Sequence, residues 1–162
     1  MNDSIGMNYC APDANVWAVN LDGRYMSAVQ NYLVADGIPT DGVTKIVSNA
    51  AQTLSYCPDP DGIGKCQKTG IVIGKVQSGK TSNFISITAL AFDNDYDIVI
   101  VLGGTKKPLV KQNRDRIKEY FSTTKDVLVL DTTDFKDQLT AQKMHQFRKM
   151  NKKVVIVALK SP

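Results

Sequence analysis

The residues of this 162-residue chain with the clearest potential for chemistry read G-x-x-x-x-G-K-T, from Gly74 to Thr81. In this pattern a glycine-bounded loop opens a helix, and its backbone N–H groups hold a di- or triphosphate together with the helix dipole. Lys80 is expected to reach the β- and γ-phosphates, and the Thr81 hydroxyl to bind Mg²⁺. The loop residues expected to contact ATP are Gly74, Gln77, Ser78 and Gly79. The alternative is a glycine-rich turn that matches by coincidence.

ATP hydrolysis also needs an acidic ligand for Mg²⁺, usually at the end of a buried strand, and a group that orients water. Asp131 follows the apolar run Val-Leu-Val-Leu and is the candidate. The competing interpretation is a strand end followed by a helix N-cap, with Asp134 nearby. The alternating acids of residues 93–97 resemble a calcium loop but lack its glycine and glutamate, so a solvated turn is expected there.

A second polar segment follows the apolar run that ends at Leu102. A threonine and several lysines at the start of a helix can bind a nucleic-acid phosphate, and such loops lie on the ligand-binding edge of parallel sheets. The candidate contacts are Thr105, Lys106, Lys107 and Lys111, with Arg114 adding charge. The alternative is a solubilising helix face.

The composition indicates one ordinary globular domain, with 43% hydrophobic and 22% charged residues and a net charge of +4. That charge is compatible with nucleic acid without requiring it. We expect no membrane span, because no apolar run approaches ~20 residues. Three cysteines and no signal-peptide pattern favour a reducing cytoplasm. Cys57 and Cys66 are expected to be free thiols rather than zinc ligands, since only Cys10 and His145 could complete a site.

Two parts are expected along the chain. Residues 1–68 form a tail and a helical extension, with helices over Tyr25–Val34 and Val43–Tyr56. Residues 69–162 alternate strands and helices, which predicts an α/β fold, a parallel sheet with helices on both faces. The expected strands are 71–73, 97–102, 127–130 and 153–159, of which 97–102 is expected to be buried on both faces. The expected helices are 82–93, 108–121 and 135–150.

From about Leu54 to Pro162 the chain resembles the first RecA-like, P-loop NTPase domain of superfamily 2 helicases, and more narrowly the Z-one domain of helicase-like endonucleases. The resemblance rests on G-x-V-Q-S-G-K-T at Gly74–Thr81 and on the strand ending Val101-Leu102-Gly103-Gly104. Further similar segments are Leu109–Gln112, Asp134-Phe135 and Val157–Lys160.

The resemblance implies an ATP- and Mg²⁺-dependent ATPase of helicase or translocase type that acts on nucleic acid, DNA being the expected one, with an endonuclease in the parent protein. The family's acidic motif and second RecA-like domain do not occur before Pro162, so we expect an N-terminal piece that hydrolyses ATP slowly or not at all. Two alternatives stay open: a small-molecule phosphoryl transferase, and a non-catalytic nucleotide-binding interaction module.

Overall fold

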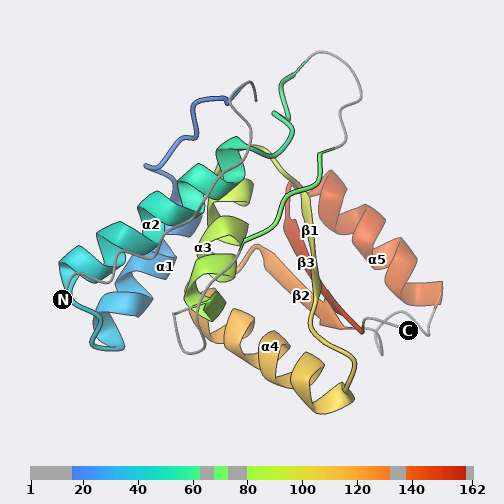
Figure 1. The fold of residues 1–162 in the computed structure, drawn as a ribbon. Helices are drawn as coiled ribbons and strands as arrows, with labels where there is room; N and C mark the ends of the chain where they lie inside the picture. Colours follow the sequence, from blue (N-terminus) through green and yellow to red (C-terminus); the bar gives the residue numbers. More distant parts are fainter. Residues whose placement is uncertain (1–15, 63–67, 73–79, 132–137, 160–162) are drawn as a thin grey trace.

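A small parallel sheet flanked by helices organises the chain. The computed structural model describes residues 16–62, 68–72, 80–131 and 138–159. In these residues five helices and three strands follow one another as α1 (Arg24–Ala35), α2 (Thr40–Ser55), α3 (Lys80–Asp93), β1 (Ile98–Leu102), α4 (Lys107–Tyr120), β2 (Val127–Asp131), α5 (Gln138–Lys149) and β3 (Lys153–Ala158). Figure 1 shows α3 and α4 on one side of the sheet and α5 on the other. The α/β class predicted from the sequence is therefore confirmed.

The described strands lie in the order β1-β3-β2, and both pairs are parallel. Ile98 is opposite Val154, and Val127 is opposite Lys153. Since side chains alternate along a strand, each strand offers one row of residues to each face of the sheet. The row that includes Val155 and Val157 joins the main hydrophobic core, while the neighbouring row, including the fully buried Val154, points to the α5 side.

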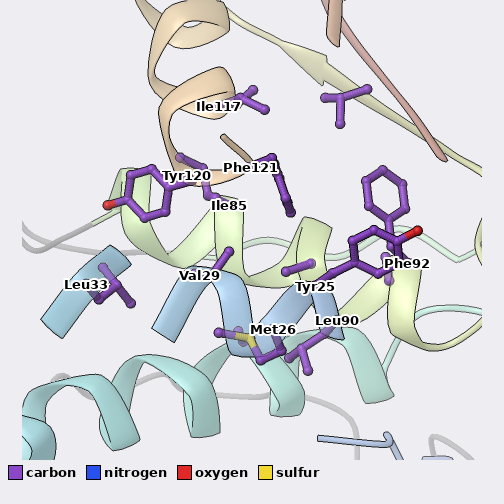
Figure 2. Packing of buried hydrophobic residues seen from close by; sticks show 14 of the residues in the cluster. Tyr25, Met26, Val29, Leu33, Ile85, Leu90, Phe92, Ile117, Tyr120 and Phe121 are labelled. Atoms are coloured by element: carbon purple, nitrogen blue, oxygen red, sulfur yellow. The ribbon is translucent and has the colours of Figure 1, made fainter. Parts of the chain in front are cut away.

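The main core lies between that sheet face and helices α3 and α4, and continues on the other side of α3, where α1 and α2 pack (Figure 2). Aromatic rings join its layers. The ring centroids of Tyr25 and Phe92 are 5.5 Å apart, edge to face, and those of Phe92 and Phe121 are 6.1 Å apart. Such pairs add to the stabilisation from burial alone. The helical extension and the sheet thus share one apolar interior.

The helices begin and end where the sequence provides the signals. After α1, the N–H of Ile38 donates to the Leu33 carbonyl and that of Gly37 to the Val34 carbonyl, which is the Schellman arrangement. Gly37 has a φ of +85°, a conformation that favours glycine. Pro108 lies in the first turn of α4, as predicted.

Two expectations about the strands are wrong. Ile71 and Val72 form no strand in the structure and are 82% and 48% exposed; Ile73 lies outside the described residues. β1 is not buried on both faces, because Ile100 and Leu102 are each 62% exposed. The physical reason is that β1 is at one edge of the described sheet, whereas α5 packs against the central strand β3.

About the first 20 residues are expected from the sequence to be a poorly structured tail. Residues 1–15 lie outside the described residues. The Trp17 indole N–H, however, donates to the Cys57 carbonyl at 3.0 Å, and Val19 packs against the core.

Candidate functional site at the start of α3

Helix α3 begins at Lys80, the lysine of the phosphate-loop pattern. The Lys80 side chain is exposed and Thr81 is half-buried. Nη1 of Arg116, on α4, donates to the Thr81 hydroxyl at 3.3 Å. One residue further on, the Ser82 and Tyr120 hydroxyls lie 3.0 Å apart. The first turn of α3 is therefore held against α4 by two polar contacts.

The remaining loop residues of the pattern lie outside the described residues; they are Gly74, Gln77, Ser78 and Gly79. What can be described of the site is the helix start that follows them. The exposed ammonium of Lys80 is one of the two features that a phosphate requires of this position, the other being the backbone N–H groups of a helix start.

The candidate acid, Asp131, is the last residue of β2 and is only 6% exposed. One of its carboxylate oxygens forms an ion pair with Nη1 of Arg114 on α4. The Arg114 side chain is 22% exposed, so the pair is largely removed from water. A buried carboxylate that already has a guanidinium partner is well explained by structure alone. This contact weakens the case for Asp131 as a Mg²⁺ ligand and removes Arg114 from the freely available cations.

The glycine pair after β1 fixes the start of α4. Gly104 has a φ of +116°, where other residues are strained, and a methyl on Gly103 would meet Val157 Cγ1 at 3.0 Å. The Gly103 N–H donates to the Ala158 carbonyl, and its own carbonyl accepts from Asn113 Nδ2 at 3.1 Å. This turn presents the four predicted nucleic-acid contacts, all exposed: Thr105, Lys106, Lys107 and Lys111.

Helix α4 connects the candidate residues in a way that sequence reasoning missed. Arg114 contacts Asp131 and Arg116 contacts Thr81, so each proposed Mg²⁺ ligand has its own arginine. The partners are 17 and 35 residues apart along the chain. No local pattern signals such pairs, because only the packing of α4 beside α3 and β2 brings them together.

The other sequence candidates have structural roles. Asp93, in the acid-rich turn, accepts the backbone N–H groups of Tyr25 and Met26 at the start of α1. Burial raises the pKa of the Asp93 carboxyl, an effect that these two donors partly oppose. Burial also raises the pKa of the Cys57 thiol, which fits an unreactive free thiol. Within the described residues, no group of three or more His, Cys, Asp or Glu side chains could hold a metal ion.

Comparison with known proteins gives no family for this chain: no protein-family model, curated protein or solved structure matches it. The resemblance to helicase-like proteins therefore rests on the sequence motifs alone. In the part of the chain that the structure describes, every helix is too short or too polar to cross a membrane.

Proposed function

We propose that this chain is the ATP-binding portion of a nucleic-acid-dependent ATPase of helicase or translocase type. The observation that carries the proposal is that Lys80 of the G-x-x-x-x-G-K-T pattern is exposed in the first described turn of α3, directly after residues 73–79, which lie outside the described residues. Phosphate-binding loops need that placement, since the helix N-terminus provides the donors.

Each residue then has a defined task. Lys80 offsets the charge of the β- and γ-phosphates, and the loop from Gly74 to Gly79 wraps them with backbone N–H groups. Thr81 would hold Mg²⁺ once its hydroxyl exchanges the Arg116 contact for the ion. When bound, Mg²⁺–ATP supplies the transferable phosphoryl group.

The nucleic-acid part of the proposal rests on the loop between β1 and α4. Lys106 is the N-cap residue of α4 and makes no side-chain cap, and Pro108 lies in the first turn. The start of α4 is thus a helix N-terminus surrounded by exposed lysines, which suits a backbone phosphate. Contacts with backbone phosphates do not distinguish one base sequence from another, nor DNA from RNA. The preference for DNA therefore comes only from the family resemblance.

A second candidate function is nucleotide binding without turnover. The ion pair between Asp131 and Arg114 favours it, because the one strand-end acid of the described sheet already has a cation partner. The isolated chain should then bind ATP and hydrolyse it far below ~1 s⁻¹, the low end of ordinary enzyme turnover.

Calorimetry with Mg²⁺–ATP tests the proposal. The unmodified chain should bind, Lys80→Ala should lose binding because a methyl cannot offset phosphate charge, and Lys106→Ala is the charge-matched control that should bind normally. Equal affinity of the unmodified chain and Lys80→Ala would refute the site. In a parallel oligonucleotide titration, Lys106→Ala with Lys107→Ala should weaken binding and flatten the salt dependence by ~0.7 for each single-strand phosphate that the variant no longer neutralises.

A further inference from the structure

An open pocket of about 810 Å³ with four charged side chains in its lining lies at the amino-terminal edge of the sheet, where β2 and β3 begin. Three segments that are distant in sequence line it. They are the first two turns of α1 with Arg24, Ser27 and Asn31, the turn of residues 123–126 before β2, and Lys152 before β3. Strand direction places this edge opposite the one that carries Asp131 and Gly103.

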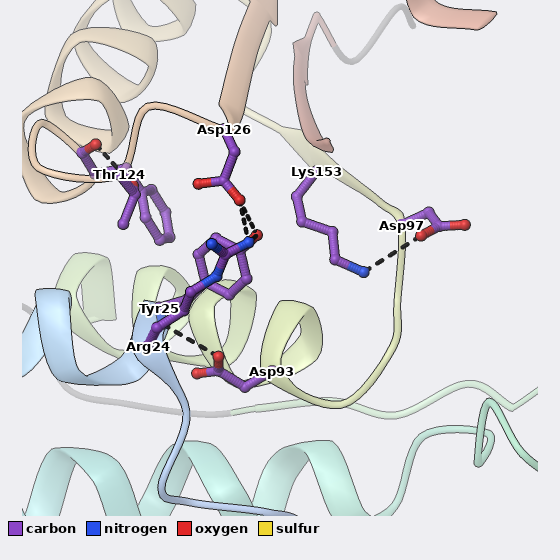
Figure 3. A network of polar contacts seen from close by, with 8 residues as sticks. Arg24, Tyr25, Asp93, Asp97, Thr124, Asp126 and Lys153 are labelled. Atoms are coloured by element: carbon purple, nitrogen blue, oxygen red, sulfur yellow. Dashed lines mark hydrogen bonds and ion pairs between the residues drawn. The ribbon is translucent and has the colours of Figure 1, made fainter. Parts of the chain in front are cut away.

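The single carboxylate of the pocket is already neutralised. Figure 3 shows Oδ2 of Asp126 facing both Arg24 and Tyr25. Arg24 forms an ion pair with this oxygen, and the Tyr25 hydroxyl donates to it at 2.6 Å. The Arg24 guanidinium also lies 4.6 Å from the centre of the Tyr25 ring, which helps to fix its position. Asp126 therefore has little remaining attraction for a further cation.

Two lysines of the pocket are left with their charge uncompensated. Among the described interactions, neither Lys125 nor Lys152 has a carboxylate partner, whereas the neighbouring Lys153 lies 3.3 Å from Asp97. The Lys152 ammonium is 4.9 Å from the centre of the Phe147 ring, so its stem is held in place. With one carboxylate against Arg24 and the two lysines, the lining carries an excess of two positive charges.

We infer that this pocket binds a dianionic phosphate group, inorganic phosphate or a phosphate monoester, between Lys125 and Lys152. The charge excess of two matches a dianion, and lysine is a common phosphate ligand that acts as a point charge. Asn31 and Thr123 add neutral hydrogen-bonding groups to the same wall. The inference does not depend on the proposed function, since none of these residues belongs to the loop that ends at Lys80.

Amide-resolved NMR titration with inorganic phosphate tests the inference, at about pH 8, where phosphate is mainly a dianion. The Lys80→Ala chain is used, so that the result is independent of the nucleotide site. Saturable shifts are expected at Asn31, residues 123–126 and Lys152. Replacing both Lys125 and Lys152 by alanine should weaken binding about tenfold or more, because the variant cannot form two charge-assisted hydrogen bonds to the ion.

The matched control is the double replacement Lys45→Ala with Lys118→Ala, which removes the same charge from exposed positions on α2 and α4 outside the pocket. It should leave the affinity within about twofold, since screened surface charges act weakly at a distance. Absence of shifts at the pocket amides up to ~10 mM phosphate, a level that detects millimolar affinity, would overturn the inference. Equal weakening by the control pair would do the same.

A single-stranded oligonucleotide without terminal phosphate separates the two possible sources of phosphate. Its diester groups carry one charge each, so it should shift the pocket amides less than inorganic phosphate at equal phosphate concentration. If the oligonucleotide instead binds there more tightly, with a salt slope typical of backbone contacts, the site is a nucleic-acid contact and the dianion assignment is wrong.

Discussion

Replacing Gly23 by alanine should destabilise the protein, and the reason lies in Asp93. Gly23 has extended backbone angles, φ −98° and ψ 163°, that any residue adopts, so no backbone strain is involved. A methyl group there would instead overlap Cβ, Cγ and Oδ1 of Asp93. The Asp93 carboxylate accepts from the N–H of Tyr25 at 3.1 Å and from that of Met26 at 2.7 Å. The new methyl must displace the group that caps α1.

The magnitude follows from what the displaced carboxylate provides. Loss of a capping side chain costs ~1–2 kcal/mol, and its charge at the positive end of the helix adds ~0.3–1 kcal/mol. The desolvation that raises the Asp93 pKa outweighs the favourable interactions of the charge, so the net contribution is smaller than the sum of these two figures. We expect Asp93→Ala to lower the free energy of unfolding by about 2 kcal/mol, and Gly23→Ala by at least as much, since it also forces the chain apart.

Urea unfolding of a double-mutant cycle provides the assay. Asp93→Gly removes all three atoms that the methyl would meet, so in that background Gly23→Ala should cost less than ~0.5 kcal/mol. Gly42→Ala is the matched control. Gly42 is inside α2, where alanine is favoured by up to ~1 kcal/mol, and a methyl there would meet the end of the Ile38 side chain at 3.2 Å, so the net change should stay within ~1 kcal/mol. If Gly23→Ala costs as much in the Asp93→Gly background as in the unmodified chain, the explanation is refuted.

The same carboxyl predicts a pH dependence with a defined sign. Its pKa is higher in the folded protein than in the unfolded chain, so the folded state binds more protons in the interval between the two values. The stability of the unmodified chain, measured relative to that of the Asp93→Asn variant, should thus be greatest below pH ~4. It should fall as pH rises through the pKa that Asp93 has in the folded protein. A difference that instead grows with pH would contradict the burial argument.

Two further predictions concern buried polar groups. Arg114→Met should destabilise the fold by ~3 kcal/mol in urea unfolding, because it removes the guanidinium that forms an ion pair with the buried carboxylate of Asp131, and a loss below ~0.5 kcal/mol would show that the pair is unimportant. Burial raises the pKa of Tyr25 and of Tyr96 to about 12, so tyrosinate absorbance at high pH should show two late-titrating groups, and only one after Tyr25→Phe. The stability linked to these phenols is present below pH ~10 and is lost as pH rises towards 12; early titration of both rings would contradict their burial.

The sequence by itself determined most of the described helices and strands and the class of the fold, although the strand expected at 71–73 does not form at Ile71 and Val72. Apolar runs such as Val127–Leu130 are too continuous for an amphipathic helix, and the helix patterns between them have a period near 3.6, so local physics fixes both. Capping and turn residues such as Pro108 and Gly37 act over a few residues, so the helix ends that they mark can also be predicted from the sequence. The phosphate-loop pattern can be recognised for the same reason, because it lies within eight consecutive residues.

Tertiary structure alone decided which charges have partners and which strand lies at the edge. The ion pair of Asp131 with Arg114, 17 residues away, forms only because α4 packs beside β2. The run at 97–102 predicts a strand buried on both faces, yet the order β1-β3-β2 leaves Ile100 exposed. The pocket between Arg24, Lys125 and Lys152 joins three distant segments. Ion pairs between distant residues, the strand order and the pocket all depend on how the helices and strands pack together. The free energy that favours one packing comes from contacts throughout the core, so no short stretch of sequence reveals it.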